Sequence, residues 1–473
     1  MQRRTFALGS LALLGCAQGA APRPTESSSF DRDDPFIAEL QERTFRWFWE
    51  QTPADTGLTP DRWPTPTFCS VAAVGFALTV YGVGAERGWI SRAQALERTL
   101  NTLRFFHDAP QGPSESGVIG HRGFFYHFLD ARSGMRFGQV ELSSIDTTLL
   151  LGGVLFAQSY FDGASVQERE VRRLADDIYS RVEWSWLRPR PPLVGMSWKP
   201  EAGGRFGISD WDVYNEGALV YVLGLGSPAH PLPDGAWEAW TSRFGPQWGA
   251  RWGEPHLQFP PLFGHQYSHI WVDFRGIQDA LMRGKGADYF ENSRRATYAQ
   301  QAYAIANPGG FRAYGASVFG LTACDGPGDF IREVDGRRRE FFSYSARGPG
   351  DRDDGTLAPT ALAGSIPFAP EITIPALKEI HRRYGETIYT NYGFLDSFNP
   401  TLRDRGANLL HGRIVDGVGW VDGDYLGIDQ GPIVCMIENW RSGFIWKVMR
   451  RSAPMRRGLE RAGFSGGWLA AAP

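Results

Sequence analysis

The sequence predicts an all-α protein, built as a double-layered helical barrel with long loops and a few short strands. Almost wholly apolar helical segments alternate along the chain with amphipathic ones, and loops rich in Gly, Pro and Trp join them. Apolar helices need cover on every side, whereas amphipathic helices have one face for solvent, so the alternation indicates an inner and an outer layer. No βαβ rhythm, Gly-rich phosphate loop or short repeat period argues for another class.

The first helix is expected in residues 34–51, with Asp34 as its cap, Pro35 in its first turn and a helical stripe of apolar residues. An apolar helix is expected in 68–88, and an amphipathic one in 91–109, capped by Ser91. The alternating stretch 123–130 is expected to form short strands. Further helices are expected in 144–161, 165–184, 215–225, 293–307, 374–385 and 427–449.

The N-terminus has the three parts of an export signal: Arg3 and Arg4, an apolar run from Phe6 to Leu14, and small residues. The arginine pair followed by Thr and Phe resembles a twin-arginine signal, which predicts a periplasmic protein. The sequence around Cys16 resembles a lipobox, so a lipid tether at Cys16 is an alternative. We expect residues 1–34 to be the signal and a disordered leader, and residues 35–473 to form a single domain.

The composition excludes some partners and favours others. The net charge is −3, with basic and acidic residues spread evenly, so nucleic acid is not an expected partner. Aromatic residues make up 14% of the chain, and many of the 17 Trp and 16 Tyr stand beside Gly, Asp, Asn or His. Such rings suit either stacking on sugars or the packing of a large core.

No cofactor or metal site is expected. Cys69, Cys324 and Cys435 lie far apart, with no CxxC spacing, and are typical of small buried residues, although a disulfide between two of them is possible. We expect a monomer that binds an oligosaccharide or polysaccharide.

Polar residues interrupt the predicted buried helices in three places, where we expect the chemistry. The first contains Asp130, Glu141 and Asp146, just before or on an apolar helix; Asp146 could equally be a helix-cap or first-turn acid. In the second, Glu216 opens the helix 215–225 behind Trp211, Tyr214 and Asn215. It could complement the helix dipole, but an exposed cap would not need those rings.

The third place holds His265, Gln266, His269, Trp271, Asp273 and Arg275 within eleven positions. This density of donors, acceptors and aromatic rings suits the recognition of sugar hydroxyls. A metal on His265, His269 and Asp273 is conceivable, but no HExxH pattern is present.

Several blocks together resemble the bacterial glucoamylase-like domain family, similar to the β-1,2-glucanases of glycoside hydrolase family 144. They run in order over essentially the whole mature chain, and they include "ELSSIDTTLLLGGVLFAQSYF", "YNEGALVYVLGLGSPAHP", "PLFGHQYSHIWVDFRG", "DDGTLAPTALAGSIPFAPE" and "YLGIDQGPIVCMIENWRSGFIW". The resemblance implies an (α/α)6 barrel and cleavage of β-1,2-glucan, either endo or by release of sophorose. It also implies catalytic roles for Glu216 and Asp146. This chain departs from the family's expected pattern before the helix 144–161, where Glu141 stands five residues before Asp146.

Hydrolysis of a glycosidic bond needs one protonated carboxyl and one ionised carboxylate. Glu216 is the candidate acid, because burial among rings disfavours its charged form. Asp146 is the first candidate for its partner, Glu141 and then Asp130 are the reserves, and Asp354 and Asp429 are more distant alternatives. The resemblance implies inversion, so the carboxyls should lie roughly 6.5 to 9.5 Å apart. The predicted substrate-binding residues are Tyr126, Asp130, Trp211, Tyr214, His265, Gln266, His269, Trp271, Asp273, Arg275, Asp354, Asp429 and Gln430.

Three other readings remain open. One is a non-catalytic periplasmic glucan-binding protein with the same cleft, which the export signal and the aromatic residues fit equally well. The second is an α-glucosidase or transglycosylase on the same fold. The third is a polysaccharide lyase, which would use Tyr or His as its base.

Overall fold

The computed structural model describes residues 31–470. Residues from Arg32 onward form one compact unit. The predicted export signal, including Arg3, Arg4 and Cys16, lies outside the described residues. Within the described part of the chain, no helix is long and apolar enough to cross a membrane.

An inner ring of helices forms the centre of this unit. α2 packs on α4, α4 on α6 and α6 on α8; α8 and α11 pack on α13, and α13 returns to α2. Every residue of α2 from Val71 to Gly84 is buried, as the apolar sequence requires. The inner helices are α2 (Val71–Glu86), α4 (Ser144–Tyr160), α6 (Gly217–Gly226), α8 (Tyr267–Trp271), α11 (Pro359–Ala363) and α13 (Gly427–Arg441).

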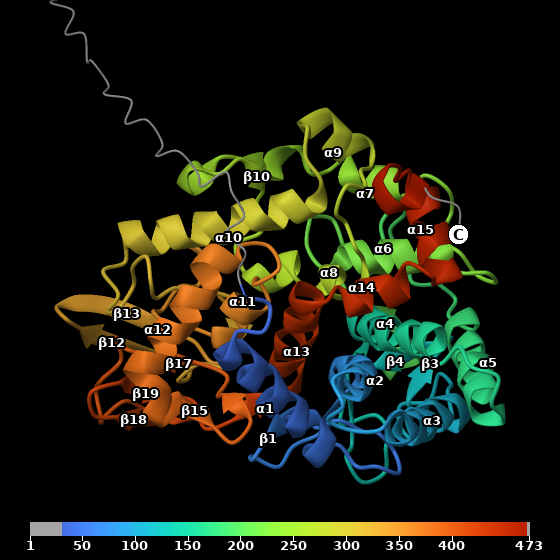
Figure 1. Ribbon diagram of the computed structural model, residues 1–473, viewed down its shortest axis with the longest axis horizontal. Coiled ribbons are helices and arrows are strands. Elements are labelled where there is room, and N and C mark those ends of the chain that lie inside the picture. Colours follow the sequence, from blue (N-terminus) through green and yellow to red (C-terminus); the bar gives the residue numbers. More distant parts are fainter. Residues whose placement is uncertain (1–30, 471–473) are drawn as a thin grey trace, which may run out of the picture. The chain divides into compact units, whose positions relative to one another are not determined.

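Amphipathic helices cover this ring from outside. α3 packs on α2 and α5 on α4, with α3 and α5 also in contact with each other (Figure 1). α5 buries only one stripe, which includes Val171, Leu174 and Ile178. The outer helices are α1 (Pro35–Gln51), α3 (Arg92–Asp108), α5 (Val166–Ser180), α7 (Ala236–Thr241), α10 (Tyr289–Ala306) and α12 (Pro370–Ile388), with α9 (Ala280–Lys285), α14 (Phe444–Met449) and α15 (Ala453–Arg461) beside them. The double-layered helical barrel predicted from the sequence is therefore confirmed.

The helix predicted over 427–449 is divided into α13 and α14. The break lies at Gly443, whose φ of +69° is a left-handed conformation that glycine adopts without strain. The apolar pattern continues across the break because both helices are buried, so the pattern alone does not reveal the turn.

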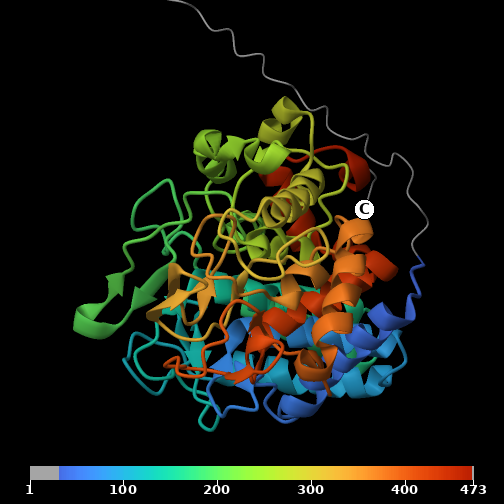
Figure 2. The ribbon, with the colours of Figure 1, turned by 90° about the vertical axis from the view of Figure 1, so that its left-hand side faces the viewer.

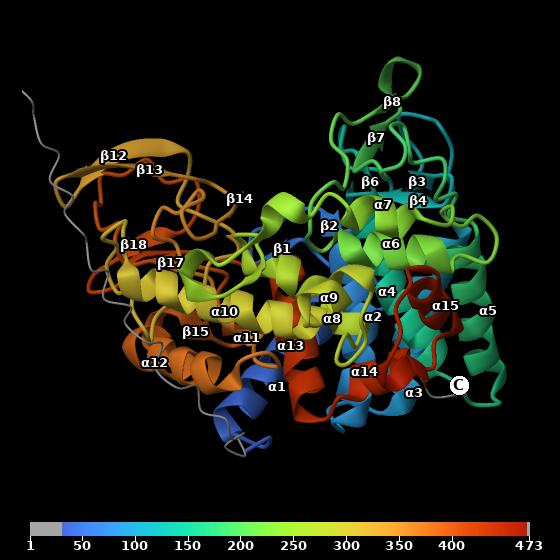
Figure 3. The same ribbon diagram turned by 90° about the horizontal axis from the view of Figure 1, so that it is seen from above.

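Short strands in the long loops lie mostly along one side of the barrel (Figure 3). The largest sheet has the order β3-β4-β6-β7-β8, and its hairpin β7–β8, drawn in green, projects from the helices in Figure 2. In chain order, the strands up to residue 257 are β1 (Arg62–Trp63), β2 (Cys69–Ser70), β3 (Gly120–His121), β4 (Phe124–Tyr126), β5 (Phe128–Leu129), β6 (Leu142–Ser143), β7 (Ser197–Lys199), β8 (Arg205–Phe206), β9 (Trp248–Gly249) and β10 (His256–Leu257).

The second half of the chain adds further short antiparallel pairs. β1 pairs with β20, so that the first and last strands of the chain meet. The remaining strands are β11 (Ala323–Cys324), β12 (Phe330–Val334), β13 (Arg337–Phe341), β14 (Ser345–Ala346), β15 (Tyr389–Thr390), β16 (Gly393–Phe394), β17 (Phe398–Asn399), β18 (Arg413–Val415), β19 (Gly419–Val421) and β20 (Tyr425–Leu426). Cys69, Cys324 and Cys435 are free and buried.

Candidate active site

The N-terminal ends of the inner helices meet at a cavity of about 500 Å³. Ser70 caps α2, Asp146 stands in the first turn of α4, Glu216 precedes α6 and Tyr267 begins α8. Aromatic and aliphatic side chains form much of the wall between these polar groups. The cavity is lined by Asp61, Arg62, Phe68, Ser70, His127, Phe128, Ile145, Asp146, Leu149, Glu216, Phe263, Tyr267, Ala323, Tyr344, Ala346, Leu426 and Ile428.

The side chain of Glu216 does not cap helix α6. It holds the N-cap position of α6, but its side chain accepts no capping hydrogen bond. Asn215 takes that role, since its Oδ1 accepts from the backbone N–H of Gly217 at 2.9 Å. The Glu216 side chain is 7% exposed, and its Oε2 has no hydrogen-bond partner among the described residues. A buried carboxyl oxygen without a partner, at the wall of a cavity, is free for a ligand.

The surroundings of Glu216 favour its protonated form. Burial raises the pKa of Glu216 to about 7, and the negative charge of Asp146 also raises it, against a hydrogen bond from the residue's own backbone. A carboxyl that keeps its proton near neutral pH can serve as a general acid.

Asp146 lies in a different electrostatic environment within the same cavity. Ser143 Oγ donates to Asp146 Oδ2 at 2.5 Å, and His127 Nε2 lies 3.4 Å from Asp146 Oδ1. Burial raises the pKa of Asp146 above its ordinary value, and the charge of Glu141 adds to this rise, while His127 and Ser143 reduce it. Asp146 therefore has a cationic neighbour, which stabilises its ionised form, and Glu216 has none of this kind.

His127 joins Asp146 to Glu141. Its Nδ1 lies 2.8 Å from Glu141 Oε1, opposite the nitrogen that faces Asp146. Burial opposes the charge of His127, but Asp146 and Glu141 outweigh it and raise the pKa of His127 to about 9. The hydrogen bond from His127 lowers the pKa of Glu141 to about 2. At neutral pH, Glu141 is thus an ionised carboxylate that orients an imidazolium toward Asp146.

Acidic residues also gather near β1 and α13, where Asp61 lines the cavity and Asp325 and the predicted residue Asp429 lie behind its wall. Arg62 donates to Asp325 at 2.6 Å and lies 3.5 Å from Asp61. Burial raises the pKa of Asp61 to about 6, although Arg62 and His127 lower it. Asp429 accepts from the Tyr267 hydroxyl at 3.5 Å, and burial raises the pKa of Asp429. Of these residues Asp61 and Arg62 face the cavity, where a carboxyl and a guanidinium can bind hydroxyl groups.

The stretch from His265 to Arg275 is adjacent to Glu216, but apart from Tyr267 its side chains do not line the cavity. Ser268 Oγ donates to the Glu216 carbonyl at 3.0 Å, which fixes the backbone there. The predicted substrate-binding residues of this stretch make internal contacts instead: His265 with the Phe259 carbonyl, Gln266 with the Ala361 carbonyl and Ser365, His269 with Ser293, and Trp271 with Thr79. Phe263 and Tyr267 are the members of this region that line the cavity.

Arg275 does hold an acid, but that acid is Asp273. It donates to both oxygens of Asp273, at 2.7 and 2.8 Å, and Arg450 contacts the same carboxylate. Neither Arg275 nor Asp273 lines the cavity of Glu216.

Other predicted residues support the cavity from behind. Trp211 donates its Nε1–H to Ser144 Oγ at 2.8 Å, and the buried ring of Tyr214 stacks on Tyr289. Tyr126 is buried in β4 under the guanidinium of Arg136. Asp130 accepts from the backbone N–H groups of a local turn, and Gln430 is buried with its Nε2 near the Phe394 carbonyl at 3.4 Å. The cavity lining includes none of these five predicted residues.

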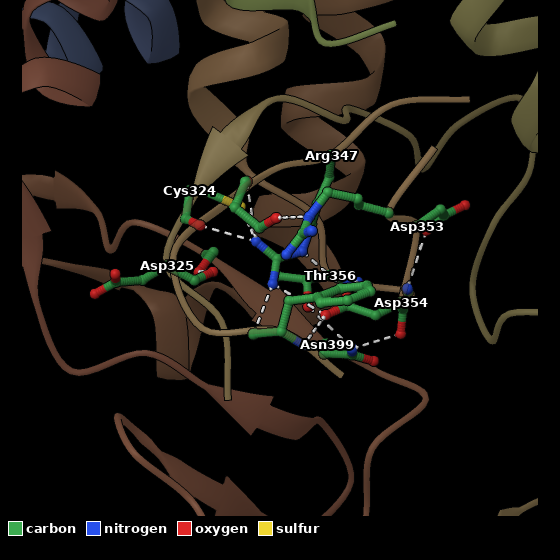
Figure 4. A network of polar contacts seen from close by, with 12 residues as sticks. Cys324, Asp325, Arg347, Asp353, Asp354, Thr356 and Asn399 are labelled. Atoms are coloured by element: carbon green, nitrogen blue, oxygen red, sulfur yellow. Dashed lines mark hydrogen bonds and ion pairs between the residues drawn. The ribbon is translucent and has the colours of Figure 1, made fainter. Parts of the chain in front are cut away.

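Asp354 does not line the cavity but belongs to a buried network behind it (Figure 4). Arg347 donates to both of its oxygens at 2.9 Å, and also to the carbonyls of Cys324 and Phe342. Both side chains are 0% exposed. The ion pair between Arg347 and Asp354 therefore stabilises the packing of the long loops that follow α10.

We expect Arg347→Met to lower the free energy of unfolding by about 3–5 kcal/mol, because it leaves the Asp354 charge buried and unpaired. Chemical denaturation of the two proteins measures the difference. The matched control is Arg312→Met, which removes an ion pair with Asp335 whose side chains are 45% and 41% exposed, and which should cost at most about 1 kcal/mol. Equal losses for the two variants would contradict the structural role.

Several cavity residues were missing from the sequence prediction, notably His127, Asp61, Arg62 and Tyr267. His127 stands in the alternating stretch 123–130, and strand alternation alone would have put it on the opposite side from Tyr126. Tyr267 lies between Gln266 and His269, and the sequence prediction named those two residues, but not Tyr267, as substrate-binding. Within residues 31–470, no group of His, Cys, Asp or Glu is arranged to hold a metal ion.

Comparison with known proteins gives a consistent picture. A family model described as "Putative glucoamylase" matches residues 209–453, just over half of the chain. An exo β-1,2-glucooligosaccharide sophorohydrolase (non-reducing end) from Parabacteroides distasonis is 27% identical over 463 residues, which cover 91% of this chain. The chain spans about 58% of the length of that curated relative.

Solved structures agree on the fold. A putative glucoamylase from Bacteroides uniformis is 28% identical with a TM-score of 0.79, over 94% of this chain and 100% of that one. An endo-β-1,2-glucanase from Chitinophaga pinensis, in complex with sophorotriose and glucose, is 26% identical with a TM-score of 0.76, over 93% of this chain and 100% of that one. The resemblance and the fold class inferred from the sequence are both confirmed.

Proposed function

This chain belongs to the putative glucoamylase family, and from that premise we propose that it is a glycoside hydrolase that cleaves β-1,2-linked glucan. The observation that carries the proposal is Glu216, a buried carboxyl with an unpartnered oxygen at the wall of a cavity of about 500 Å³. The relatives named as β-1,2-glucan hydrolases support this choice of substrate. The aromatic side chains of the wall, such as Phe68, Phe128 and Tyr344, suit the apolar faces of sugar rings.

In the proposed reaction, protonated Glu216 gives its proton to the oxygen of the leaving sugar. Asp146, ionised beside the imidazolium of His127, accepts a proton from the water that attacks the anomeric carbon. The C–O bond to the leaving sugar breaks as the bond from water forms, and the proton taken up by Asp146 balances the one lost by Glu216. Glu141 does not line the cavity and acts through His127.

We expect inversion at the anomeric carbon, so the first product from a β-linked substrate should be the α-anomer. Proton NMR during the first minutes of digestion distinguishes the α- and β-anomeric signals before mutarotation mixes them. A β-anomer as first product would mean retention, with Asp146 or another carboxylate as a nucleophile.

The test of the activity itself is the release of reducing ends from linear β-1,2-glucan and from short β-1,2-glucooligosaccharides, with α-glucans alongside. Accumulation of sophorose alone would indicate exo action, and a mixture of longer products would indicate endo action. Cleavage of α-glucans would support the α-glucosidase alternative. Tight binding of β-1,2-glucan with no products in any assay would leave the glucan-binding alternative.

We further propose that the protein acts in the periplasm, on the strength of the twin-arginine-like segment at Arg3 and Arg4. Cell fractionation tests this location. Recovery of the protein in the membrane fraction, and its release by Cys16→Ser, would indicate the lipid tether.

A further inference from the structure

A second large cavity, of about 560 Å³, lies at the opposite end of α13 from the candidate active site. Ile428, near the start of α13, lines the active-site cavity, and Trp440, near its end, lines the second one. Twelve residues of α-helix span about 18 Å. The strands near the active site and the helix α14 near the second cavity lie along opposite edges in Figure 3. The two cavities are therefore separate sites.

The second cavity is strongly cationic. Among the described residues that line it, five carry a positive charge and none is acidic. The lining residues that matter here are Arg32, Arg275, Arg441, Lys447 and Arg450, together with Trp440 and Trp446.

The acids nearest to these cations leave the charge unbalanced. Asp273, whose side chain is 0% exposed, is shared by Arg275 and Arg450, so one carboxylate serves two guanidinium groups. The Arg441 guanidinium pairs with Asp33, whose side chain is 83% exposed. A bond to so exposed a carboxylate neutralises little charge.

Glu438, the other buried acid close by, is already engaged. Arg87 donates to both of its oxygens, at 2.7 and 2.8 Å, and Ser442 Oγ donates to it at 2.6 Å. Arg87 does not line the cavity. The charge of Glu438 is therefore balanced elsewhere and does not offset the cations of the cavity.

Tryptophan rings hold two of the cations in place. The guanidinium of Arg275 lies over Trp446, 4.1 Å from the ring centroid, and that of Arg32 lies over Trp440 at 4.9 Å. Stacking on a ring uses the face of a guanidinium and leaves its edge for hydrogen bonds. Nη1 of Arg32 already donates to the Trp440 carbonyl, and Nε and Nη2 of Arg275 donate to Asp273, so the other edge N–H groups are the ones that a ligand can use. Burial and the charge of Arg275 both lower the pKa of Arg32, so these cations lie close enough to repel each other.

The groups that remain accessible in the second cavity determine which class of ligand it can bind. Trp440 and Trp446 are 4% and 2% exposed, so their rings are not platforms for another sugar. Arg441 donates through Nε, Nη1 and Nη2 to Arg32, Gln41 and Asp33. What the lining still offers is the Lys447 ammonium together with the other edge N–H groups of Arg32, Arg275 and Arg450, which suit a compact group with several acceptor oxygens. We propose that this cavity binds a phosphate group, either as inorganic phosphate or on a small phosphate ester.

Isothermal titration calorimetry at constant ionic strength tests this, with inorganic phosphate in one arm, glycerol phosphate in a second and chloride in a third. We expect saturable binding in the first or second arm and none in the third. The arm that binds more tightly identifies free phosphate or an ester as the ligand. Lys447→Met and Arg32→Met should each weaken that binding by about tenfold, since each removes one charge-assisted contact.

The control is Lys285→Met, an exposed lysine on α9 that lies outside this cavity and should bind as wild type does. Cleavage of β-1,2-glucan should be unchanged in all three variants. No saturable heat in either phosphate arm, or equal weakening in Lys285→Met, would overturn the proposal.

Discussion

Replacement of Glu216 by Gln is expected to lower kcat on β-1,2-glucan by about 10²- to 10⁴-fold, which is the contribution of a positioned general acid. The amide keeps the shape of the carboxyl but has no proton to transfer to the leaving oxygen. Since Oε2 has no partner among the described residues, the substitution breaks no side-chain hydrogen bond of that oxygen. The fold and the binding of oligosaccharide should survive, and circular dichroism and calorimetry with the variant check both.

The matched control is Glu168→Gln, because Glu168 is also 7% exposed and stands in the first turn of α5. It pairs with Arg92 away from the cavity, so this variant should keep its kcat even if it loses some stability. A folded Glu216→Gln variant with near wild-type turnover would exclude Glu216 as the acid.

The same residue predicts the pH dependence of the enzyme. A general acid works only while protonated, so activity should fall as the pH rises through about 7, the raised pKa of Glu216. The pH profile of kcat/KM measures this fall.

The protonation of Glu216 also affects the free energy of unfolding, in the same direction. Because the pKa of Glu216 in the folded protein is above its ordinary value of 4.5, the folded protein binds this proton more tightly than the unfolded chain does. That stability is fully present below about 4.5 and is lost as the pH rises through about 7. Denaturation of wild type and Glu216→Gln at pH 4 and pH 8 measures it.

The sequence predicted the layers of the barrel well, because the apolar content of a helix decides how much of its surface must be buried. α2 and α4 are so apolar that only an inner position can bury them, and α5 has one clear apolar stripe. The inner helices α8 and α11 were not predicted, because each has only five residues and shows little more than one turn of any periodicity.

The candidate site was predicted less completely, because the direction of a side chain depends on backbone turns. The residues from His265 to Arg275 come close to Glu216 in the fold, as the density of polar groups indicated. However, the short helix α8 directs Tyr267 toward the cavity and His269 toward Ser293. Glu216 was identifiable from its ring-walled position before an apolar helix, whereas His127 depends on a contact with Glu141 fourteen residues later.

Replacement of Asp146 by Asn is the second substitution from which we expect a large loss, about 10²-fold or more in kcat, because the amide cannot accept a proton from water. The substitution should also change the pH profile of kcat/KM, which the loss of a purely structural residue would not do. The charge of Asp146 raises the pKa of Glu216, so its removal should shift the alkaline fall in kcat/KM toward lower pH. The pH profile of kcat/KM, measured with wild type and Asp146→Asn, reports this shift.

Glu141→Gln is the discriminating control for Asp146, since Glu141 reaches the cavity only through His127. The Gln variant keeps the side-chain shape and removes one of the three carboxylates, Asp146, Glu141 and Asp61, that raise the pKa of His127. Its loss of kcat should therefore be several-fold smaller than that of Asp146→Asn, and the alkaline fall should move little. A larger loss of kcat in Glu141→Gln than in Asp146→Asn would make Glu141 the base and Asp146 the supporting residue. Equal and complete losses in both would instead indicate that Glu141, His127 and Asp146 act as one unit, whose removal at any point disables the base.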